Sequence, residues 1–290
     1  MQDQLTRFVF DSAPARGATI RLDAAWQAML SRRDYPPRLR TLLGELTAAG
    51  ALLAANLKFD GTLILQLHGN AALQLLVVEV SQDTLRATAR WEGDVPDHAT
   101  LADLLGQGRF VITLDPKTGG DPYQGIVALE GDSVAAMLEH YMQRSEQVDT
   151  RLLLAADEQV ATGLLLQKLP TDTDNPDDWP RVVLLADTLG QAELLAAPSD
   201  VLLHRLFHEE TLQVFEPTHC HFACTCSRER VGGMLKMLGR EEVDAVVAEQ
   251  GSVSVQCEFC NQNYVFDEDD MASLFPLHLD LPTAAPTPLH

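Results

Sequence analysis

CTC at 224–226 and CEFC at 257–260 are the stretches that decide how the C-terminal part of this 290-residue chain folds. Each stretch brings two thiols close together along the chain, and two such pairs are typical of tetrahedral sites in which four sulfurs bind one zinc ion. Thiolates are soft ligands that favour zinc over magnesium or calcium. We therefore expect one zinc ion per chain in the reduced state, bound by Cys224, Cys226, Cys257 and Cys260.

The spacing of each pair suits a shared ion. In an extended segment residues i and i+2 face the same side, so Cys224 and Cys226 can offer both sulfurs to one metal. The CxxC pair can do the same from a turn. Four protein ligands close the coordination shell and leave no position for a catalytic water. The pattern therefore predicts that the protein is not a metalloenzyme.

The spacing alone allows three interpretations of this site. It can be an inert zinc clip, a zinc finger that binds nucleic acid, or a thioredoxin-like dithiol, although the CxxC lacks the βαβ context of the last. Nucleic-acid binding is disfavoured because the flanks would repel phosphate. These flanks carry Glu229, Glu241, Glu242, Asp244, Glu249, Glu258, Asp267, Glu268, Asp269 and Asp270.

The composition predicts a globular protein with two domains. Hydrophobic residues make up 46% of the chain, enough to form a core, and the net charge of -21 argues against nucleic acid as a partner. The first residues show no basic stretch leading into an apolar run, and the most apolar segment, at 46–57, is too short to span a bilayer. All five cysteines lie between Cys220 and Cys260, as in a metal or redox site. We expect a cytoplasmic protein without membrane contact.

Apolar periodicity predicts an α+β fold. The first part of the chain should form a mixed sheet-and-helix domain, with helices over 39–57 and from Asp132 or Ser133 to Arg144. Turn signals separate the expected strands. These strands lie at 62–67, 73–80, 84–91, 110–114, 123–129, 151–156 and 163–169.

The rest of the chain divides into three further segments. Residues 171–180 are acidic and carry two prolines, so 1–170 is the expected N-terminal domain and 171–217 an acidic loop with a helical linker. Leucine spacing predicts linker helices over 181–197 and 199–210. The small zinc-binding domain is expected over 218–275, and a disordered tail over 276–290.

Two weaker motifs match neither a metal-binding nor a nucleotide-binding pattern. His204 and His208 lie at i, i+4, but Arg205 stands where the HExxH zinc motif requires glutamate. We interpret them as polar positions on an amphipathic helix. The pair Gly119-Gly120 matches neither a phosphate loop nor a dinucleotide fingerprint, so the sequence predicts no use of ATP.

The cysteine stretches resemble the redox switch of the heat-shock protein 33 family. They are CTCSRER at 224–230 and CEFCNQNYVF at 257–266. Members of this family are redox-regulated cytosolic holdase chaperones. The resemblance covers about Gln4 to Phe266. Further segments resemble the family in the expected order. They are DYP at 34–36, LKFDG at 57–61, YQGIVALEGD at 123–132, RSEQ at 144–147 and RLFHEE at 205–210.

The resemblance implies a mechanism. The four cysteines would bind zinc when reduced; oxidation would form disulfides from the same residues, expel zinc and unfold a metastable linker. The protein would then hold unfolding client proteins without ATP, as a homodimer. Four cysteines allow three disulfide pairings, which stay open. Cys220 lies outside the family pattern, and it could compete for zinc or divert the disulfides.

The residues suit such a switch. Zinc held by both pairs closes a loop of thirty intervening residues, and a structural zinc contributes about 10–16 kcal/mol to folding. The core of so small a module supplies about 3–5 kcal/mol, so loss of the metal should unfold it. Leucine faces on the linker would then be uncovered. They comprise Leu184, Leu185, Leu189, Leu194, Leu195, Leu202, Leu203 and Leu206.

Overall fold

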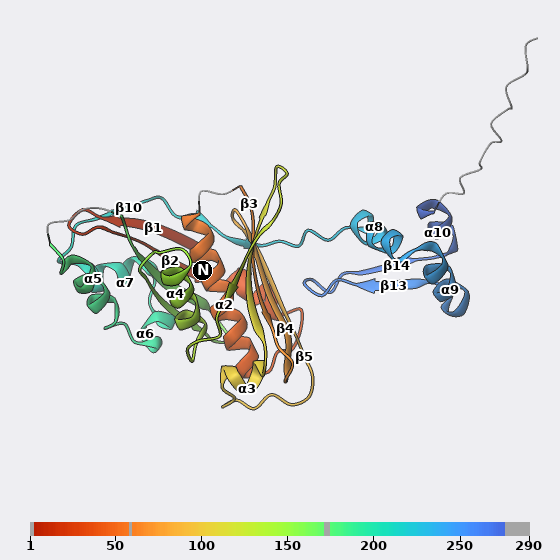
Figure 1. Cartoon of the computed structure of the whole chain (residues 1–290), viewed down its shortest axis with the longest axis horizontal. Helices are drawn as coiled ribbons and strands as arrows, with labels where there is room; N and C mark the ends of the chain where they lie inside the picture. The colour runs from red at the N-terminus through yellow and green to blue at the C-terminus, as the bar shows by residue number, and fades with distance from the viewer. Residues whose placement is uncertain (1–2, 58–59, 171–174, 276–290) are drawn as a thin grey trace, which may run out of the picture. The chain divides into compact units, whose positions relative to one another are not determined.

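The computed structural model describes residues 3–57, 60–170 and 175–275. It divides into two compact units, Met1–Cys224 and Thr225–His290 (Figure 1). The α+β class predicted from the sequence is confirmed. In the described ranges, helices that combine the length and apolarity needed to cross a membrane are absent. The predicted tail at 276–290 lies outside the described residues.

The first unit contains two six-stranded sheets. The first sheet has the order β10-β1-β2-β9-β8, with β11 also paired to β1, and the second has the order β12-β5-β4-β3-β6-β7. The strands of the first sheet are β1 Gln4–Phe10, β2 Ala15–Leu22, β8 Thr150–Ala156, β9 Ala161–Lys168, β10 Leu212–Val214 and β11 Thr218–His219. Those of the second are β3 Gly61–His68, β4 Leu73–Ser81, β5 Thr84–Trp91, β6 Arg109–Pro116, β7 Tyr123–Val127 and β12 His221–Phe222.

A long helix, α2 (Pro37–Asn56), lies between the two sheets and forms the centre of the main core (Figure 1). Its apolar residues are buried all around the helix, which requires cover on more than one side. Three shorter helices complete this part of the unit: α1 Ala24–Leu30, α3 Leu101–Leu105 and α4 Val134–Arg144. Ser133 caps α4 by accepting a hydrogen bond from the backbone N–H of Ala136, as its sequence position predicts.

Both faces of the first sheet are apolar. On β9, Leu165 belongs to the core around α2, whereas its neighbours Leu164 and Leu166 belong to a second core on the opposite face. Side chains alternate between the faces of a strand, so this run of leucines is buried on both sides. The second core also contains Phe8 and Phe10 of β1.

Three helices cover this second face: α5 Asp178–Ala186, α6 Gln191–Ala196 and α7 Ser199–Phe207. We call Asp178–Phe207 the cover. Its buried side chains pack on the first sheet, and Phe207 stacks edge-to-face on Phe10 with ring centroids 5.0 Å apart. Every buried residue of this core belongs to the first unit.

The single helix predicted over 181–197 is wrong. The chain leaves the helix after Ala186 and re-enters at Gln191. At the break, the hydroxyl of Thr188 donates to the carbonyl of Leu185 at 2.7 Å, and the N–H of Leu189 bonds to Ala186, one residue tighter than an α-helix. The carbonyl of Gly190 then accepts from Glu193 and Leu194 to start α6. The second linker helix begins at Ser199 as predicted and ends at Phe207.

The segment after the cover runs along the edges of both sheets before it reaches the first cysteine of the CTC pair. β10 and β11 pair with β1, and β12 pairs in parallel with β5. Between them the N–H of Cys220 donates to the carbonyl of Asp3 at 2.9 Å. We call residues 211–223 the strap. The strap belongs to the first unit, although the sequence assigned its last part to the zinc-binding domain.

The second unit is a hairpin with three helices around a small core. Its elements are α8 Arg228–Leu238, α9 Arg240–Gln250, β13 Val253–Gln256, β14 Asn263–Phe266 and α10 Glu268–Leu274. Among the described residues the fully buried apolar side chains of this core are Leu235, Val243, Phe266 and Met271. So few buried side chains leave the module dependent on a further cross-link.

The packing predicts that Phe207 anchors the cover. Replacing it by alanine, Phe207→Ala, should lower the free energy of unfolding of the first unit by about 3–5 kcal/mol, because a fully buried aromatic ring is lost. Urea denaturation followed by circular dichroism measures this. The matched control is Leu184→Ala on α5, whose side chain is exposed and should cost less than about 0.5 kcal/mol. Equal losses for both variants would contradict the assignment.

Candidate metal centre

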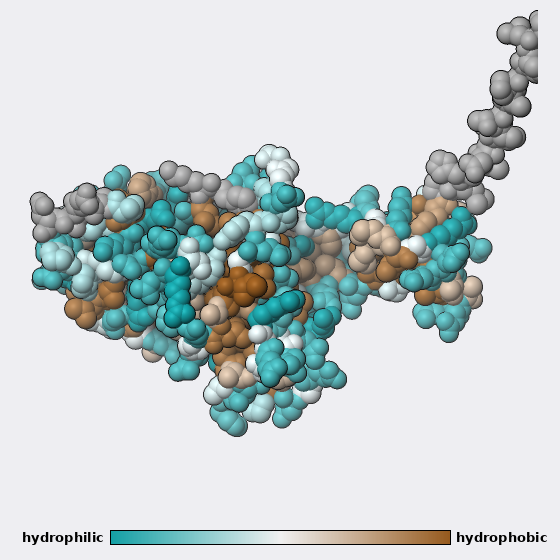
Figure 2. All heavy atoms as spheres, in the orientation of Figure 1, coloured by the Kyte–Doolittle hydropathy of each residue, from teal (hydrophilic) through white to brown (hydrophobic). Residues whose placement is uncertain are grey.

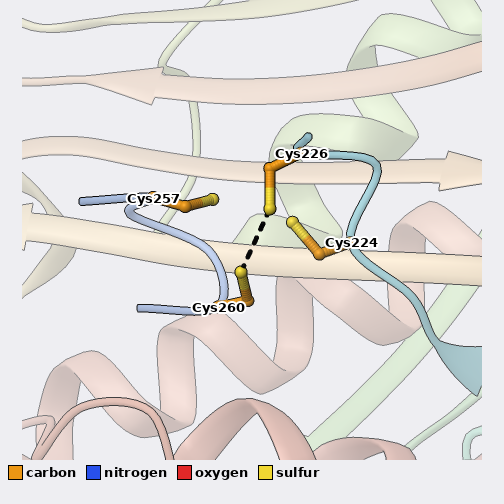
Figure 3. Close-up of side chains that lie close together, drawn as sticks. All are labelled: Cys224, Cys226, Cys257 and Cys260. Carbon is orange, nitrogen blue, oxygen red and sulfur yellow. Dashed lines mark hydrogen bonds between the residues drawn. The ribbon is translucent and has the colours of Figure 1, made fainter. Parts of the chain in front are cut away.

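The structure brings the four thiols of the two cysteine pairs together. Their Sγ atoms all lie within 4.8 Å of one another, and in Figure 3 the four side chains point toward a common centre. All four are reduced cysteines and half-buried. They are Cys224, Cys226, Cys257 and Cys260.

The donor set fits a tetrahedral metal. With metal–sulfur bonds of about 2.3 Å, a tetrahedron places its sulfurs about 3.8 Å apart, and the sulfurs of Cys226 and Cys260 are separated by 3.3 Å. That separation is far beyond the about 2.05 Å of a disulfide bond. The arrangement therefore corresponds to the reduced protein, and it could hold a metal ion through four soft ligands.

A turn between β13 and β14 presents the CxxC pair. The N–H of Cys257 donates to the carbonyl of Gln262 at 2.9 Å, and the N–H of Asn261 donates back to the carbonyl of Cys257 at 2.8 Å. Asn261 has a φ of 58°, a left-handed conformation that asparagine tolerates better than most residues. These bonds curl the chain so that Cys260 returns toward Cys257.

The CxC pair lies in an extended stretch between the strap and α8. The N–H of Ala223 donates to the carbonyl of Leu85 at 3.3 Å, which fixes the chain just before Cys224. Ser227 follows the pair and caps α8 by accepting from the N–H of Arg230. Arg230 in turn donates to the carbonyl of Thr225, between the two cysteines, at 2.9 Å. The pair is thus held at both ends.

Two polar side chains touch the sulfurs, and sequence reasoning missed both. The hydroxyl of Tyr264 donates to Cys226 Sγ at 3.1 Å, and this hydrogen bond to the sulfur raises the pKa of Tyr264 to about 12. Arg86 on β5 donates to Cys224 Sγ at 3.5 Å and forms a salt bridge with Glu79 at 2.6 Å. Tyr264 lies within the quoted CEFCNQNYVF stretch, but Arg86 has no signal in the sequence.

Cys220 is set apart from this group. Its side chain is buried in the main core of the first unit. Burial, with help from the nearby carboxylates of Asp3 and Asp83, raises the pKa of the Cys220 thiol to about 12. A thiol with this pKa is almost fully protonated at neutral pH and is a poor ligand and nucleophile.

The histidine pair is not part of the cysteine cluster. His204 and His208 lie on one face at the end of α7, with ring centroids 6.2 Å apart. Within the described ranges, the four cysteines are the only group of three or more metal-ligating side chains close enough to share an ion.

These features define a two-unit α+β protein in which four clustered cysteines could hold a metal ion. A family model described as Hsp33 protein matches residues 3–267. The chain is 56% identical over 276 residues to the 33 kDa chaperonin of Chromobacterium violaceum, an alignment that covers 94% of each protein. It is 50% identical to the 33 kDa chaperonin of Neisseria meningitidis serogroup A, with 94% and 91% covered.

A solved structure supports the same fold. The crystal structure of the 33 kDa chaperonin of Thermotoga maritima, also titled heat shock protein 33 homolog, matches with a TM-score of 0.82 at 22% identity, over 94% of this chain and 97% of that one. The chain belongs to the Hsp33 family. It is therefore a chaperone, which acts by binding other proteins and not as an enzyme.

The first test of the site is metal content. Reduced protein should contain one zinc ion per chain, and Cys257→Ser should lose most of it, because three thiolates and a hydroxyl are a far weaker donor set. Cys220→Ser is the matched control and should keep its zinc. Atomic absorption on gel-filtered protein decides it; unchanged zinc in Cys257→Ser, or loss in Cys220→Ser, would show that the ligand set is wrong.

The second test concerns Cys220. At pH 8 its thiol should resist iodoacetamide in the native protein, because its folded pKa of about 12 lies far above the pH. In urea the residue regains the ordinary pKa of about 8.5 and should react within minutes. Peptide mass spectrometry measures both. Rapid labelling of native Cys220 would contradict its burial.

Proposed function

We propose that this chaperone is a redox-regulated holdase that works without ATP. It is inactive while reduced and zinc-bound, and it binds unfolding client proteins after its four cysteines are oxidised. The observation that carries the proposal is the clustering of four cysteine thiols beside a core with few buried apolar side chains. Membership of a chaperone family supports client binding, and the four-thiol donor set supports zinc as the metal.

In the reduced state the proposed ligands are Cys224, Cys226, Cys257 and Cys260. Bound zinc would supply a cross-link between two stretches far apart in the sequence. The hydroxyl of Tyr264 and the guanidinium of Arg86 would stabilise the negative charge on the sulfurs. Four ligands leave no open coordination position, which is why the proposed role is a structural switch.

Oxidation would remove this donor set. Two thiols and one molecule of peroxide give one disulfide and two molecules of water, so two such steps convert four thiols into two disulfides. Disulfide sulfurs carry no thiolate charge and bind zinc poorly. With its few buried side chains, the module should then unfold.

Activation would reach the cover through the strap. The strap is the only covalent route from the cysteines back to α7, and it is attached to β1 and β5 by short stretches of strand pairing. Short pairings at a sheet edge open readily. Unfolding of the module at one end of the strap would therefore loosen the cover at the other.

Release of the cover would expose two apolar surfaces. One is the helix face that carries Leu202 and Phe207, and the other is the face of the first sheet that carries Phe8, Phe10 and Leu164. In the reduced state most of the visible surface of both units is hydrophilic (Figure 2). The newly exposed surfaces are the proposed client-binding sites. The net charge of -21 would keep this form soluble.

The proposal assigns separate roles to the segments recognised in the sequence. We propose that residues 1–170 form the chaperone domain, 171–217 the linker that opens, and 218–275 the zinc module, whose first residues, 218–223, belong to the strap and pair with strands of the first unit. We further propose that the oxidised form is a homodimer and that the protein acts in the cytoplasm. Neither nucleic acid nor a membrane is a proposed partner, in keeping with the acidic composition.

An aggregation assay tests this function. Peroxide-treated protein should release its zinc and suppress the aggregation of an unrelated heat-denatured protein by at least about fivefold relative to the reduced form, because the newly exposed apolar surfaces bind the aggregating protein. Addition of ATP should change nothing. Cys220→Ser keeps all four proposed ligands and controls for oxidation at the fifth cysteine.

Two results would contradict the proposal. Zinc release without any gain in suppression would favour an inert zinc clip in an interaction protein. Turnover of small disulfide substrates by the reduced protein would favour a thiol oxidoreductase.

A further inference from the structure

Two neighbouring glutamates follow α7, and they lie in opposite environments. The side chain of Glu209 is 85% exposed, whereas that of Glu210 is 7% exposed. A carboxylate withdrawn from water this far requires charged or hydrogen-bonding partners, because burial disfavours its ionised form. Glu210, unlike Glu209, must therefore bind neighbouring residues through its side chain.

Both oxygens of Glu210 are satisfied by residues of other elements. Arg181 of α5 donates from Nε to Oε1 at 2.8 Å and from Nη2 to Oε2 at 3.3 Å, which is the two-pronged geometry of strong arginine–carboxylate pairs. The hydroxyl of Ser12, in the loop between β1 and β2, donates to Oε2. The third nitrogen of Arg181 donates to Asp178 at 2.9 Å. One carboxylate thus joins the first and last parts of the cover to the first sheet.

Glu210 also lies where the chain passes from the cover to the strap. Its N–H donates to the carbonyl of Phe207, the aromatic anchor of α7, at 2.9 Å. The next residue, Thr211, accepts from the N–H of Asp11 at 3.0 Å, the first hydrogen bond between the strap and the β1 side of the sheet. Any movement of the strap away from β1 must therefore pull on Glu210.

Another ion pair in this region, Arg205 with Glu193, joins α7 to α6. Its arginine is as exposed as Arg181, at 42% against 41%, but its carboxylate is more exposed than that of Glu210, at 31% against 7%. Solvent-exposed pairs contribute little to stability, whereas the carboxylate of Glu210 is shielded from water and accepts hydrogen bonds from both Arg181 and Ser12, so its removal costs more. Glu210 should therefore control how firmly the cover is held.

We propose that the buried carboxylate of Glu210 is a latch that holds the cover on the first sheet and thereby sets how readily the chaperone becomes active. The claim that Glu210 holds the cover rests on the geometry. The claim that it sets how readily the chaperone becomes active rests on the proposed function. It predicts that breaking the latch releases the cover while zinc is still bound, so that the protein becomes a holdase without oxidation.

The experiment compares full-length Glu210→Ala, Glu210→Gln and Glu209→Ala with the wild type, all reduced and loaded with zinc. Hydrogen exchange read by mass spectrometry reports on α5 and α7, with α2 as an internal measure of intact folding. In Glu210→Ala, exchange in α5 and α7 should be at least about tenfold faster, with α2 unchanged and zinc retained. Glu210→Gln keeps the shape and loses the charge, so it should show a smaller increase; it also serves if the alanine variant fails to fold.

The same samples are assayed for suppression of aggregation without oxidant. Glu210→Ala should suppress aggregation while reduced, and Glu209→Ala should behave like the wild type. Unchanged exchange in both Glu210 variants, or equal acceleration in Glu209→Ala, would overturn the latch. Faster exchange without suppression, in an assay where oxidised wild type does suppress, would overturn its regulatory role. If oxidised wild type fails to suppress as well, the proposed function falls, and the exchange data alone decide whether the latch exists.

Discussion

The first sheet is apolar on both faces, and both faces have to be covered. On β9 the leucines alternate between the core around α2 and the core under the cover, so the strand cannot turn either side to water. One side is satisfied permanently by a long helix packed between two sheets. The other is satisfied by three short helices, each too short to be stable alone. The reduced fold therefore contains an apolar surface that is covered by three short helices, and these helices depend on their packing against the sheet for stability.

In the proposed mechanism, the position of the cysteines along the chain lets their redox state control whether the cover stays on the sheet. All four proposed ligands follow the strap, and the strap follows the cover, so the order along the chain is cover, strap and metal site. A metal that contributes about 10–16 kcal/mol to folding can keep a module with so few buried side chains folded, and a change in thiol chemistry can remove that contribution. Cys220 lies within the strap but is buried, with a raised pKa, so it stays out of the exchange while the strap is docked.

Much of this architecture could be predicted from the sequence. The four cysteines were identified from spacing, and strands such as β3, β4 and β5 were predicted from apolar runs between turn residues. β1 and β2 were not predicted, because strands buried on both faces lack the simple alternation that marks a half-exposed strand. The break before Gly190 was also missed, since the leucines continue at helical spacing on both sides of it.

Contacts between residues far apart along the chain could not be predicted from the sequence. Leucine spacing showed that the linker helices have an apolar face, but it did not identify the partner of that face, the sheet that carries Phe8 and Phe10. Arg86 and Ser12 lie far from their partners Cys224 and Glu210 along the chain, and nothing in their local sequence marks them. Charge pairing of this kind is decided by the fold.

The proposed mechanism requires that oxidation at the cysteines uncovers the second face of the first sheet while the main core stays folded. Hydrogen exchange by mass spectrometry on the zinc-bound reduced protein and the peroxide-oxidised protein tests it most directly. We expect oxidation to accelerate exchange greatly across 178–223 and the second unit, and to change it little in α2 and in β3 to β6. If the oxidised protein suppresses aggregation while the cover keeps its full protection, the client-binding surface lies elsewhere and this mechanism is wrong.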